Sequence, residues 1–361
     1  MSECVVNARF AGMRMTGVQR SAYEIVSRML ADGERLRLVS PRTGEKGVLP
    51  AERSGHIRQG HLWEQVELPA IARRSGRRAV LFSPANTGPL AVRRQVLVVH
   101  DLFPVEHPEW FSRGFGAWYR WLWPRLIPRA ARVVTNSEYT REQVLERYSL
   151  DEDRVVACRF AQDERFARPP ESKIEIFRAE QGLPERYLLY VGSIEPRKNL
   201  ATLAAAWRET TARKEGVGLV VAGGAARKAV FNASGSGAER LEDPTIHLTG
   251  YVSDEHLPLL YAGAEAFALP SLAEGFGLPV LEAMACGTPV LCSDNTALPE
   301  VAGDAARLLP ALDTGAWTGA IDAVLSDAGL RRRMSEAGRR RAGGFSWSRT
   351  ARRIKSILEE V

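Results

Sequence analysis

The sequence contains few cysteines and none of the spacings that hold a metal. Cys4, Cys158, Cys286 and Cys292 form no C-x-x-C pair, so we expect reduced, mostly buried thiols in a cytoplasmic protein. No zinc or other metal site is predicted.

Long hydrophobic runs are also missing. No apolar segment approaches the ~20 residues that cross a bilayer, and the N-terminus shows no basic stretch followed by an apolar one. The sequence therefore predicts no transmembrane helix. It also has no G-x-G-x-x-G motif, so a dinucleotide-binding site is not indicated.

The charge is positive and unevenly distributed. The 361 residues carry a net charge of +6, and residues 331–355 contain nine arginines and one lysine against a single acid, Glu336. This balance favours an acidic partner such as a nucleotide or an anionic lipid, although most of these arginines also suit a solvated helical face. No helix-turn-helix, RNP motif or zinc finger accompanies them, so we expect no nucleic-acid binding.

Short β-rich runs alternate with helical patterns along the whole chain. This alternation predicts parallel sheets in doubly wound α/β domains, and the length predicts two of them. Residues 160–172 contain Pro169-Pro170 and no strong periodicity, so they are the best linker candidate. We expect one domain over residues 1–165 and a second over residues 166–345.

The most informative stretch is 270–299. A strand over Ala266–Leu269 leads into a loop and then a helix over Leu278–Cys286, which Gly287 should end. Gly275, Phe276 and Gly277 form the loop, and glycines there let a ligand approach the backbone N–H groups at the start of the helix. Such a site binds anions.

Two carboxylates, Glu274 and Glu282, flank this loop with seven residues between them. Carboxylates accept hydrogen bonds from sugar and ribose hydroxyls. Backbone amides that bind phosphate, next to carboxylates that bind hydroxyl groups, suit a nucleotide sugar. The alternative is a helix with two solvated glutamates.

Three further segments place polar residues at predicted strand ends. Arg197 and Lys198 follow the strand Tyr187–Val191, and adjacent cations there can neutralise a diphosphate. His100 follows the strand Gln95–Val99. A glycine-bearing loop with Gly17 follows the first strand, predicted over Cys4–Arg9, and the arginines near it are contacts for phosphate or acceptor, or ordinary surface residues: Arg9, Arg14 and Arg20.

From Ser271 to Glu300 the chain resembles the E-x7-E region of retaining glycosyltransferases of family 4, which have the GT-B fold. The glycines, Pro279, the run Glu282–Ala285, the run Gly287–Val290 and Pro299-Glu300 carry the resemblance. It extends over nearly the whole chain and is most specific in the C-terminal half. It implies two Rossmann-like domains facing an interdomain cleft, with the tail 346–361 returning to the first domain.

The resemblance also implies roles for individual residues. Glu274 and the backbone of the following residues would hold the donor sugar and diphosphate, and Glu282 would bind the ribose. Lys198 and Arg197 would bind the diphosphate, and His100 would bind the donor sugar. Ser193 stands where many family members have arginine. The donor-side contacts implied are Gly17, Ser193, Tyr251, Val252, Gly275, Phe276, Gly277, Leu278 and Glu282, with core packing as the alternative for Tyr251 and Val252.

The function implied is transfer of a hexose, with retention of configuration and without a metal or other cofactor, from a nucleotide sugar to a glycan or lipid-linked glycan. GDP-mannose is the preferred donor because the likeness is to polysaccharide and O-antigen mannosyltransferases. Two alternatives remain: a UDP-sugar-dependent transferase of the same fold, and a non-catalytic glycan- or membrane-binding partner.

An aromatic and basic segment, 109–127, predicts one amphipathic helix. Phe111, Phe115 and Tyr119 would face the core. Trp118, Trp121 and Arg125 lie partly off that face, and such pairs suit either packing or a membrane interface. The protein would then work at the inner face of the cytoplasmic membrane.

Overall fold

The computed structural model describes residues 3–361 except 14, 43–48, 59, 225–229 and 232–240. The chain folds into two compact units. Unit 1 comprises residues 1–105, 117–160 and 346–361, and unit 2 comprises residues 106–116 and 161–345. The predicted division places the boundary a few residues later and keeps 106–116 in the first domain. Each unit is described by itself.

Unit 1 is built on a parallel sheet with strand order β3-β2-β1-β4-β5-β6-β7. The strands are β1 (Cys4–Asn7), β2 (Leu36–Ser40), β3 (Glu52–Arg53), β4 (Val80–Ser83), β5 (Gln95–Val99), β6 (Arg132–Thr135) and β7 (Val155–Ala157). The predicted first strand is shorter than expected, because the 3₁₀ turn η1 (Ala8–Gly12) begins directly after Asn7.

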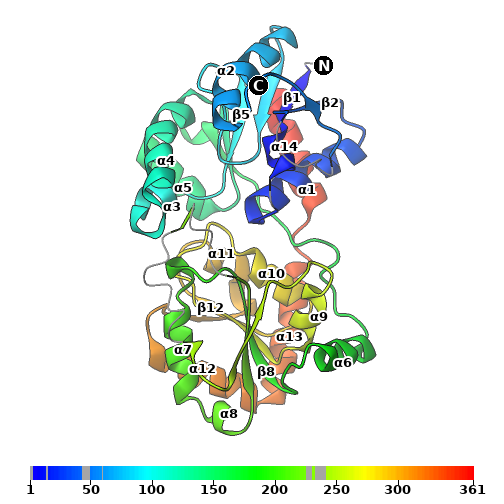
Figure 1. The fold of residues 1–361 in the computed structure, drawn as a ribbon, viewed down its shortest axis with the longest axis vertical. Helices are drawn as coiled ribbons and strands as arrows, with labels where there is room; N and C mark the ends of the chain where they lie inside the picture. Colours follow the sequence, from blue (N-terminus) through cyan, green and yellow to red (C-terminus); the bar gives the residue numbers. More distant parts are fainter. Residues whose placement is uncertain (1–2, 14, 43–48, 59, 225–229, 232–240) are drawn as a thin grey trace. The chain divides into compact units, whose positions relative to one another are not determined.

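Helices cover both faces of this sheet, as right-handed crossovers require. In Figure 1, α2 (Gly60–Arg74), α4 (Arg113–Leu126) and α5 (Glu138–Tyr148) lie on one side, and α1 (Gly17–Ala31) and α14 (Trp347–Glu360) on the other. A short helix, α3 (Phe103–Glu106), precedes α4. Ser137 caps α5 by accepting a hydrogen bond from the backbone N–H of Thr140 at 3.1 Å, as N-cap serines do.

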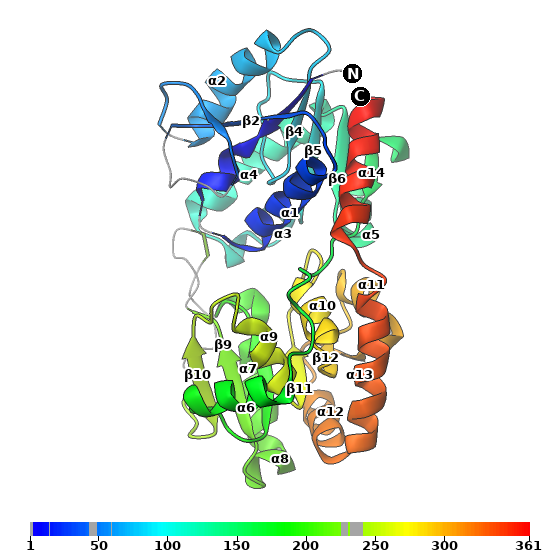
Figure 2. The ribbon, with the colours of Figure 1, turned by 90° about the vertical axis from the view of Figure 1, so that its right-hand side faces the viewer.

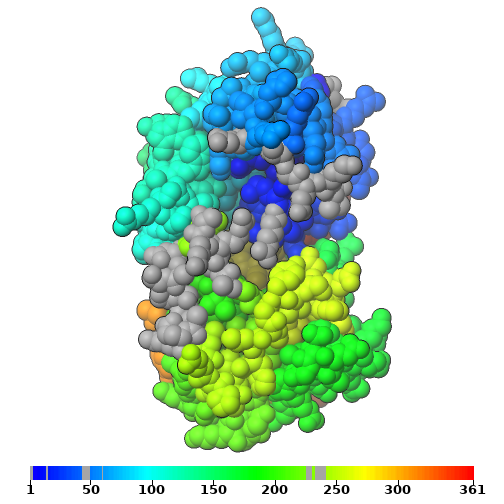
Figure 3. Space-filling view, in the orientation of Figure 1, coloured from blue at the N-terminus to red at the C-terminus, as the bar shows by residue number. Residues whose placement is uncertain are grey.

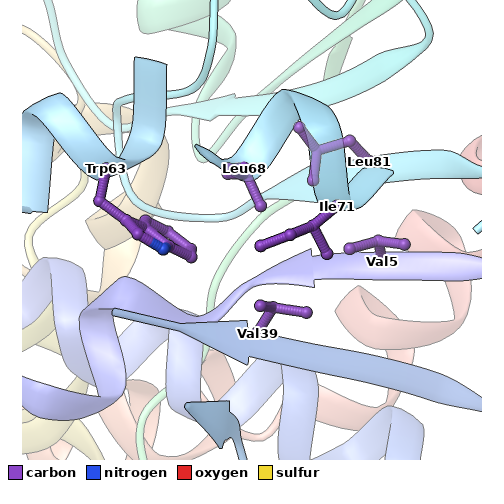
Figure 4. Packing of buried hydrophobic residues seen from close by; sticks show 6 residues of the cluster. All are labelled: Val5, Val39, Trp63, Leu68, Ile71 and Leu81. Carbon is purple, nitrogen blue, oxygen red and sulfur yellow. The ribbon is translucent and has the colours of Figure 1, made fainter. Parts of the chain in front are cut away.

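The core on the α2 side is apolar and closely packed. Trp63, Leu68 and Ile71 of α2 lie against the sheet (Figure 4), and the indole N–H of Trp63 donates to the carbonyl of Ser54 at 2.9 Å. The sheet contributes Val5, Val39 and Leu81. These contacts fix one face of α2 and therefore which of its polar residues point toward the sheet edge.

The end of the chain belongs to unit 1. Helix α14 packs on α1, with Trp347, Ile354 and Ile357 buried. Lys355 Nζ lies 2.6 Å from Glu34 Oε1 at the end of α1. The predicted return of the tail to the first domain is thus seen in the structure.

Unit 2 contains a second parallel sheet, with order β10-β9-β8-β11-β12-β13. Its strands are β8 (Tyr187–Val191), β9 (Gly218–Ala222), β10 (Ile246–Gly250), β11 (Ala266–Leu269), β12 (Val290–Ser293) and β13 (Arg307–Leu309). Two parallel, doubly wound sheets confirm the predicted fold class.

Two helical layers enclose this sheet. Helix α12 (Thr314–Ser326) packs on α7 (Leu200–Glu209) and α8 (Thr211–Lys214), while α6 (Glu171–Glu180) packs on α9 (Leu257–Gly263), as Figure 2 shows. On the latter side α13 (Ala328–Ala342) packs on α10 (Leu278–Ala285), which precedes α11 (Leu298–Ala302). Among the described residues, no helix is long and apolar enough to cross a bilayer.

One local expectation was wrong. The segment 109–127 is not one helix: residues Pro108–Trp110 form a 3₁₀ turn and α4 begins only at Arg113. Phe111 instead forms a bridge with Phe231 and stacks on Phe115 at 5.5 Å. The boundary between the two units falls directly after Phe160, within the predicted linker, where Phe160 and Phe166 are 1% and 4% exposed.

Candidate functional site

The carboxyl edge of the unit 2 sheet brings Glu274, Lys198 and Arg197 together. Lys198 and Arg197 end the 3₁₀ turn η5 (Pro196–Lys198) after β8, and Glu274 lies in the loop between β11 and α10. Lys198 Nζ donates to Glu274 Oε1 at 2.5 Å and Arg197 Nη1 to Glu274 Oε2 at 2.9 Å. Residues 76 and 77 positions apart thus form one ion cluster.

Other polar groups complete the cluster. Ser271 Oγ donates to Glu274 Oε1 at 2.7 Å, and Arg197 Nη2 donates to Glu195 Oε1 at 2.7 Å. The second oxygen of Glu195 accepts from Ser193 Oγ at 2.9 Å. Two cations therefore face two buried carboxylates, and their formal charges cancel. We name Glu195, Arg197, Lys198 and Glu274 the unit 2 ion cluster.

The environment keeps Glu274 ionised. Burial alone would raise its pKa, but Lys198 and Arg197 outweigh burial and lower the pKa from 4.5 to about 2. A charged carboxylate with fixed oxygens is a hydrogen-bond acceptor for hydroxyl groups. The two cations beside it carry the charge that a diphosphate needs.

The loop that carries Glu274 is held by the next strand connection. The backbone N–H of Glu274 donates to Thr296 Oγ1 at 2.9 Å, and Asn295 Nδ2 donates to the carbonyl of Leu272 at 3.0 Å. The N–H of Leu272 donates to the carbonyl of Arg197 at 2.8 Å. The loops after β8, β11 and β12 therefore support one another.

The glycine-bearing loop adopts the predicted geometry. Gly275, Phe276 and Gly277 are buried, and α10 begins at Leu278, which is half-buried. Gly277 has φ of +105°, a conformation that disfavours any side chain. A Cβ there would also lie 2.7 Å from Leu298 Cδ2. Gly287, with φ of +78°, follows the end of α10 as expected.

Glu282 lies apart from the cluster, one turn into α10. It is half-buried, and one oxygen accepts from the phenol of Tyr261 at 3.0 Å. Tyr261 is fully buried on α9. Glu282 is thus held by a neighbouring helix, a partner that the sequence pattern did not indicate.

Tyr251 and Val252 follow β10. Tyr251 is 72% exposed, so it is not a core residue. Both line a cavity of about 290 Å³, whose other walls include Phe177 of α6 and His256. In Figure 3, α6 and the β10–α9 segment form adjoining surface of unit 2. Their contact with a nucleobase stays a prediction.

In unit 1, His100 follows β5 at the carboxyl edge of the sheet. Its backbone N–H donates to Asn86 Oδ1 at 2.8 Å, and its Nε2 lies 3.1 Å from the carbonyl oxygen of Pro84. A carbonyl only accepts, so Nε2 carries the proton and Nδ1 is left as an acceptor. Burial lowers the pKa of His100 from 6.5 to about 4, so the ring is neutral at pH 7.

The first loop of unit 1 is described in part. Gly17 begins α1, and a Cβ there would meet no described atom within 4 Å. Arg9 is mostly buried: its Nη2 donates to Thr87 Oγ1 at 2.9 Å and its Nε lies 3.8 Å from Glu64 Oε1. It is therefore not an ordinary surface arginine. Arg14 lies outside the described residues.

Sequence reasoning missed several members of these sites, namely Glu195, Ser271, Thr296, Tyr261 and Glu64. Glu195 stands two residues before Arg197, and this short separation in the sequence could have identified it as a member of the site. The others depend on which loops meet at a sheet edge. No group of three or more His, Cys, Asp or Glu side chains among the described residues is placed to hold a metal, and metal independence stays a prediction.

Comparisons with known proteins agree with this fold. The model "Glycosyltransferase Family 4" matches residues 15–158, and "Glycosyl transferases group 1" matches residues 173–341. The O-antigen chain mannosyltransferase B of Escherichia coli is 30% identical over 92% of this chain and 93% of its own length. The serotype-specific mannosyltransferase WbdA of the same species is 29% identical over 72% of this chain, which spans only 32% of that protein.

Solved structures agree in fold. The HepE protein of Anabaena in complex with UDP-glucose superposes with a TM-score of 0.79 at 16% identity, covering 99% of this chain and 100% of that one. WaaG, a glycosyltransferase involved in lipopolysaccharide biosynthesis, gives 0.70 at 17% identity, covering 98% and 99%. The architecture is that of a GT-B glycosyltransferase. The chain belongs to the family defined by these two glycosyltransferase models, and it is an enzyme of that family.

Proposed function

We propose that the protein transfers mannose from GDP-mannose to a hydroxyl of a glycan or lipid-linked glycan in the synthesis of a surface polysaccharide such as O-antigen. The unit 2 ion cluster supports donor binding, because it places two cations and an ionised carboxylate at the ligand-binding edge of a parallel sheet. The names of the two Escherichia coli relatives support mannose and O-antigen.

The proposed chemistry breaks the bond between the sugar C1 and the diphosphate oxygen and forms a bond from C1 to the acceptor oxygen. Both electrons of the broken bond leave with the diphosphate. Lys198 and Arg197 stabilise that charge, together with amides at the start of α10, so the reaction needs no metal. The acceptor proton passes to the leaving diphosphate, and the new bond forms with retention of configuration.

Donor binding would rearrange charge in the unit 2 ion cluster. Both cations are already paired with Glu274 and Glu195, so the diphosphate has to share them. As they turn toward phosphate, Glu274 becomes an acceptor for hydroxyls of the donor sugar. Glu282 and Tyr251 with Val252 would contact ribose and base, and His100 Nδ1 would accept from the sugar.

A second part of the proposal concerns the place of the reaction, at the inner face of the cytoplasmic membrane. Trp121 on α4 is 44% exposed, and the Arg125 guanidinium lies 5.3 Å from its ring centroid. An exposed Trp/Arg pair suits a bilayer interface with anionic lipid. Co-sedimentation with phosphatidylglycerol vesicles, compared between wild type and Trp121→Ala, tests this point, and equal binding by both would contradict it.

The donor is tested by thermal unfolding in the presence of GDP, UDP, ADP or dTDP, each with and without Mg²⁺. A ligand at 100 times its dissociation constant adds about 2.7 kcal/mol to stability. We expect stabilisation by GDP that is indifferent to Mg²⁺. Stabilisation by UDP instead would indicate a UDP-sugar as the donor and would leave the proposed class of reaction, glycosyl transfer, unchanged. No stabilisation by any nucleotide would contradict the proposal that the unit 2 ion cluster binds the nucleotide part of the donor.

A further inference from the structure

Glu64 in unit 1 is a buried carboxylate that is satisfied on one oxygen only. Its side chain is fully buried on α2. Oε1 accepts from Asn7 Nδ2 at 2.5 Å and from Thr87 Oγ1 at 2.9 Å. Oε2 is buried and has no hydrogen-bond partner among the described residues. Buried polar atoms are nearly always paired, so this oxygen requires an explanation.

The carboxylate is also charged. Burial would raise the pKa of Glu64, but Arg9 and His61 outweigh burial and lower it below 4.5. Oε2 is therefore an anionic acceptor at neutral pH, and His61 Nδ1, at 3.7 Å, is too far away for a full hydrogen bond to it. The His61 side chain is 46% exposed.

A matching donor lies on the neighbouring helix α4. The indole Nε1 of Trp118 is buried and also lacks a hydrogen-bond partner among the described residues. Its ring lies 4.8 Å from the His61 ring and 5.3 Å from the Trp121 ring. An unmatched donor and an unmatched acceptor thus adjoin the same half-exposed histidine.

This group belongs to the ligand-binding edge of unit 1. Asn7 ends β1 and Thr87 follows β4, so Glu64 is held at the carboxyl edge of the sheet. Arg9, 3.8 Å from Oε1, adds positive charge and makes the site a poor one for a cation. Unlike the unit 2 ion cluster, Oε2 has no lysine or arginine within 4 Å among the described residues, so it disfavours a phosphate.

A neutral ligand rich in hydroxyl groups fits these features. A hydroxyl can donate to Oε2 and accept from the indole N–H, and the C–H face of a pyranose ring can lie on an aromatic surface. Rotation of His61 alone could supply a donor to Oε2, but it would leave the indole N–H unmatched. A bound water could serve both atoms.

We propose that Glu64, Trp118 and His61 form a subsite for a pyranose ring of the glycan acceptor, with His61 as the side chain that moves to admit it. This inference rests on the proposed function, because it assigns the acceptor side of that reaction to residues of α2 and α4. The subsite selects a neutral sugar and positions it. It takes no part in bond making.

The test uses ligand binding, which needs no turnover. The full chain is titrated with methyl α-mannopyranoside and methyl α-glucopyranoside, with binding followed by ligand-observed NMR and GDP binding by thermal unfolding. Trp118→Phe keeps an aromatic ring and removes the N–H, and Glu64→Gln keeps the shape and removes the charge. Leu62→Ala is the matched control, since Leu62 lies on α2 and is 48% exposed.

We expect each of the two subsite variants to weaken glycoside binding about tenfold, the effect of one lost hydrogen bond, while GDP binding and the Leu62→Ala protein stay unchanged. No glycoside binding by the wild type, or equal binding by wild type and Trp118→Phe, would overturn the subsite and show that water fills the place. Glycoside binding that depends on Trp118, in a protein that binds no nucleotide, would keep the subsite and reject the donor proposal. If Glu64→Gln fails to fold, Trp118→Phe still decides.

Discussion

Glu274 and Glu64 are both buried carboxylates at the carboxyl edge of a parallel sheet. They differ in how many of their oxygens accept hydrogen bonds. Both oxygens of Glu274 are paired, one with Lys198 and Ser271 and the other with Arg197. Glu64 has two donors on one oxygen and none, among the described residues, on the other. The first arrangement fixes a charge distribution before a ligand arrives. The second leaves one hydrogen bond for a ligand to make.

The difference follows from the supporting residues. In unit 2, two adjacent cations in a short turn reach Glu274, and the two connections after β8 and β12 brace its loop. In unit 1, Arg9 is the one arginine that the described residues place within 4 Å of Glu64, and it also donates to Thr87. A paired cluster suits stabilisation of a leaving group, and a partly open one suits selection among neutral ligands.

The largest expected effect comes from removing a cation of the unit 2 ion cluster. Lys198→Ala leaves Glu274 with Arg197 as its only cation and takes away charge meant for the diphosphate. We expect GDP release from GDP-mannose to fall by about 10²–10³-fold. The exposed Lys173 on α6, replaced by alanine, is the control. Full activity of the Lys198→Ala enzyme would show that the cluster is structural only.

Acid should affect the two units in different pH ranges. Folded His100 has a pKa of about 4 against 6.5, so between these values the unfolded chain binds a proton that the folded one does not. The contribution of His100 to the free energy of unfolding is therefore complete above pH 6.5. As the pH falls from 6.5 to 4, this contribution decreases by about 3 kcal/mol, at about 1.36 kcal/mol per pH unit. Glu274, with a pKa lowered to about 2, contributes above pH 4.5 and loses that contribution between pH 4.5 and 2.

Thermal unfolding of the wild type and His100→Gln at a series of pH values measures this difference. The His100→Gln protein should lose less stability than the wild type between pH 6.5 and 4, and the two should behave alike below pH 4. Identical curves for both proteins across the whole range would contradict the assignment to His100.

The smallest expected effect comes from replacing one glycine in each unit, Gly277 and Gly60, by alanine. The two variants compare how tightly the two sheet edges are packed. Gly277→Ala should cost about 1–3 kcal/mol, because φ is +105° and Leu298 Cδ2 is 2.7 Å from the new Cβ. Gly60→Ala should cost less than about 1 kcal/mol, because Gly60 has no positive φ, the nearest atom to the new Cβ is Arg9 Cδ at 3.1 Å, and alanine favours the helix. Thermal midpoints of the two variants measure this, and equal shifts would contradict the steric argument.

The sequence was sufficient for features that depend on local signals. Helix α10 begins after Gly277 and ends before Gly287 as predicted, because the apolar spacing and both glycines act within one turn. Arg197, Lys198 and Glu274 could be named because each follows a recognisable strand, and parallel strands bring their carboxyl ends to one edge.

The rest depends on contacts between distant segments. Nothing within α2 marks Glu64 as buried, because its partners Asn7 and Thr87 come from other parts of unit 1. The helix predicted from residue 109 begins later because Phe111 pairs with Phe231, 120 positions away by their numbers. Tyr261 reaches Glu282 only because α9 packs beside α10. Periodicity carries no information about such pairs.

The return of α14 to α1 has a consequence for the order of synthesis. Unit 1 needs residues 346–361, but the ribosome must first make residues 161–345, which belong to unit 2. At roughly 5–20 residues per second this takes about 10–40 s. During that time α1 lacks the helix that covers it, so the nascent first half exposes an apolar surface that only the last helix removes. Unit 2 is fully synthesised before unit 1 can complete its fold, although most of unit 1 is made before most of unit 2.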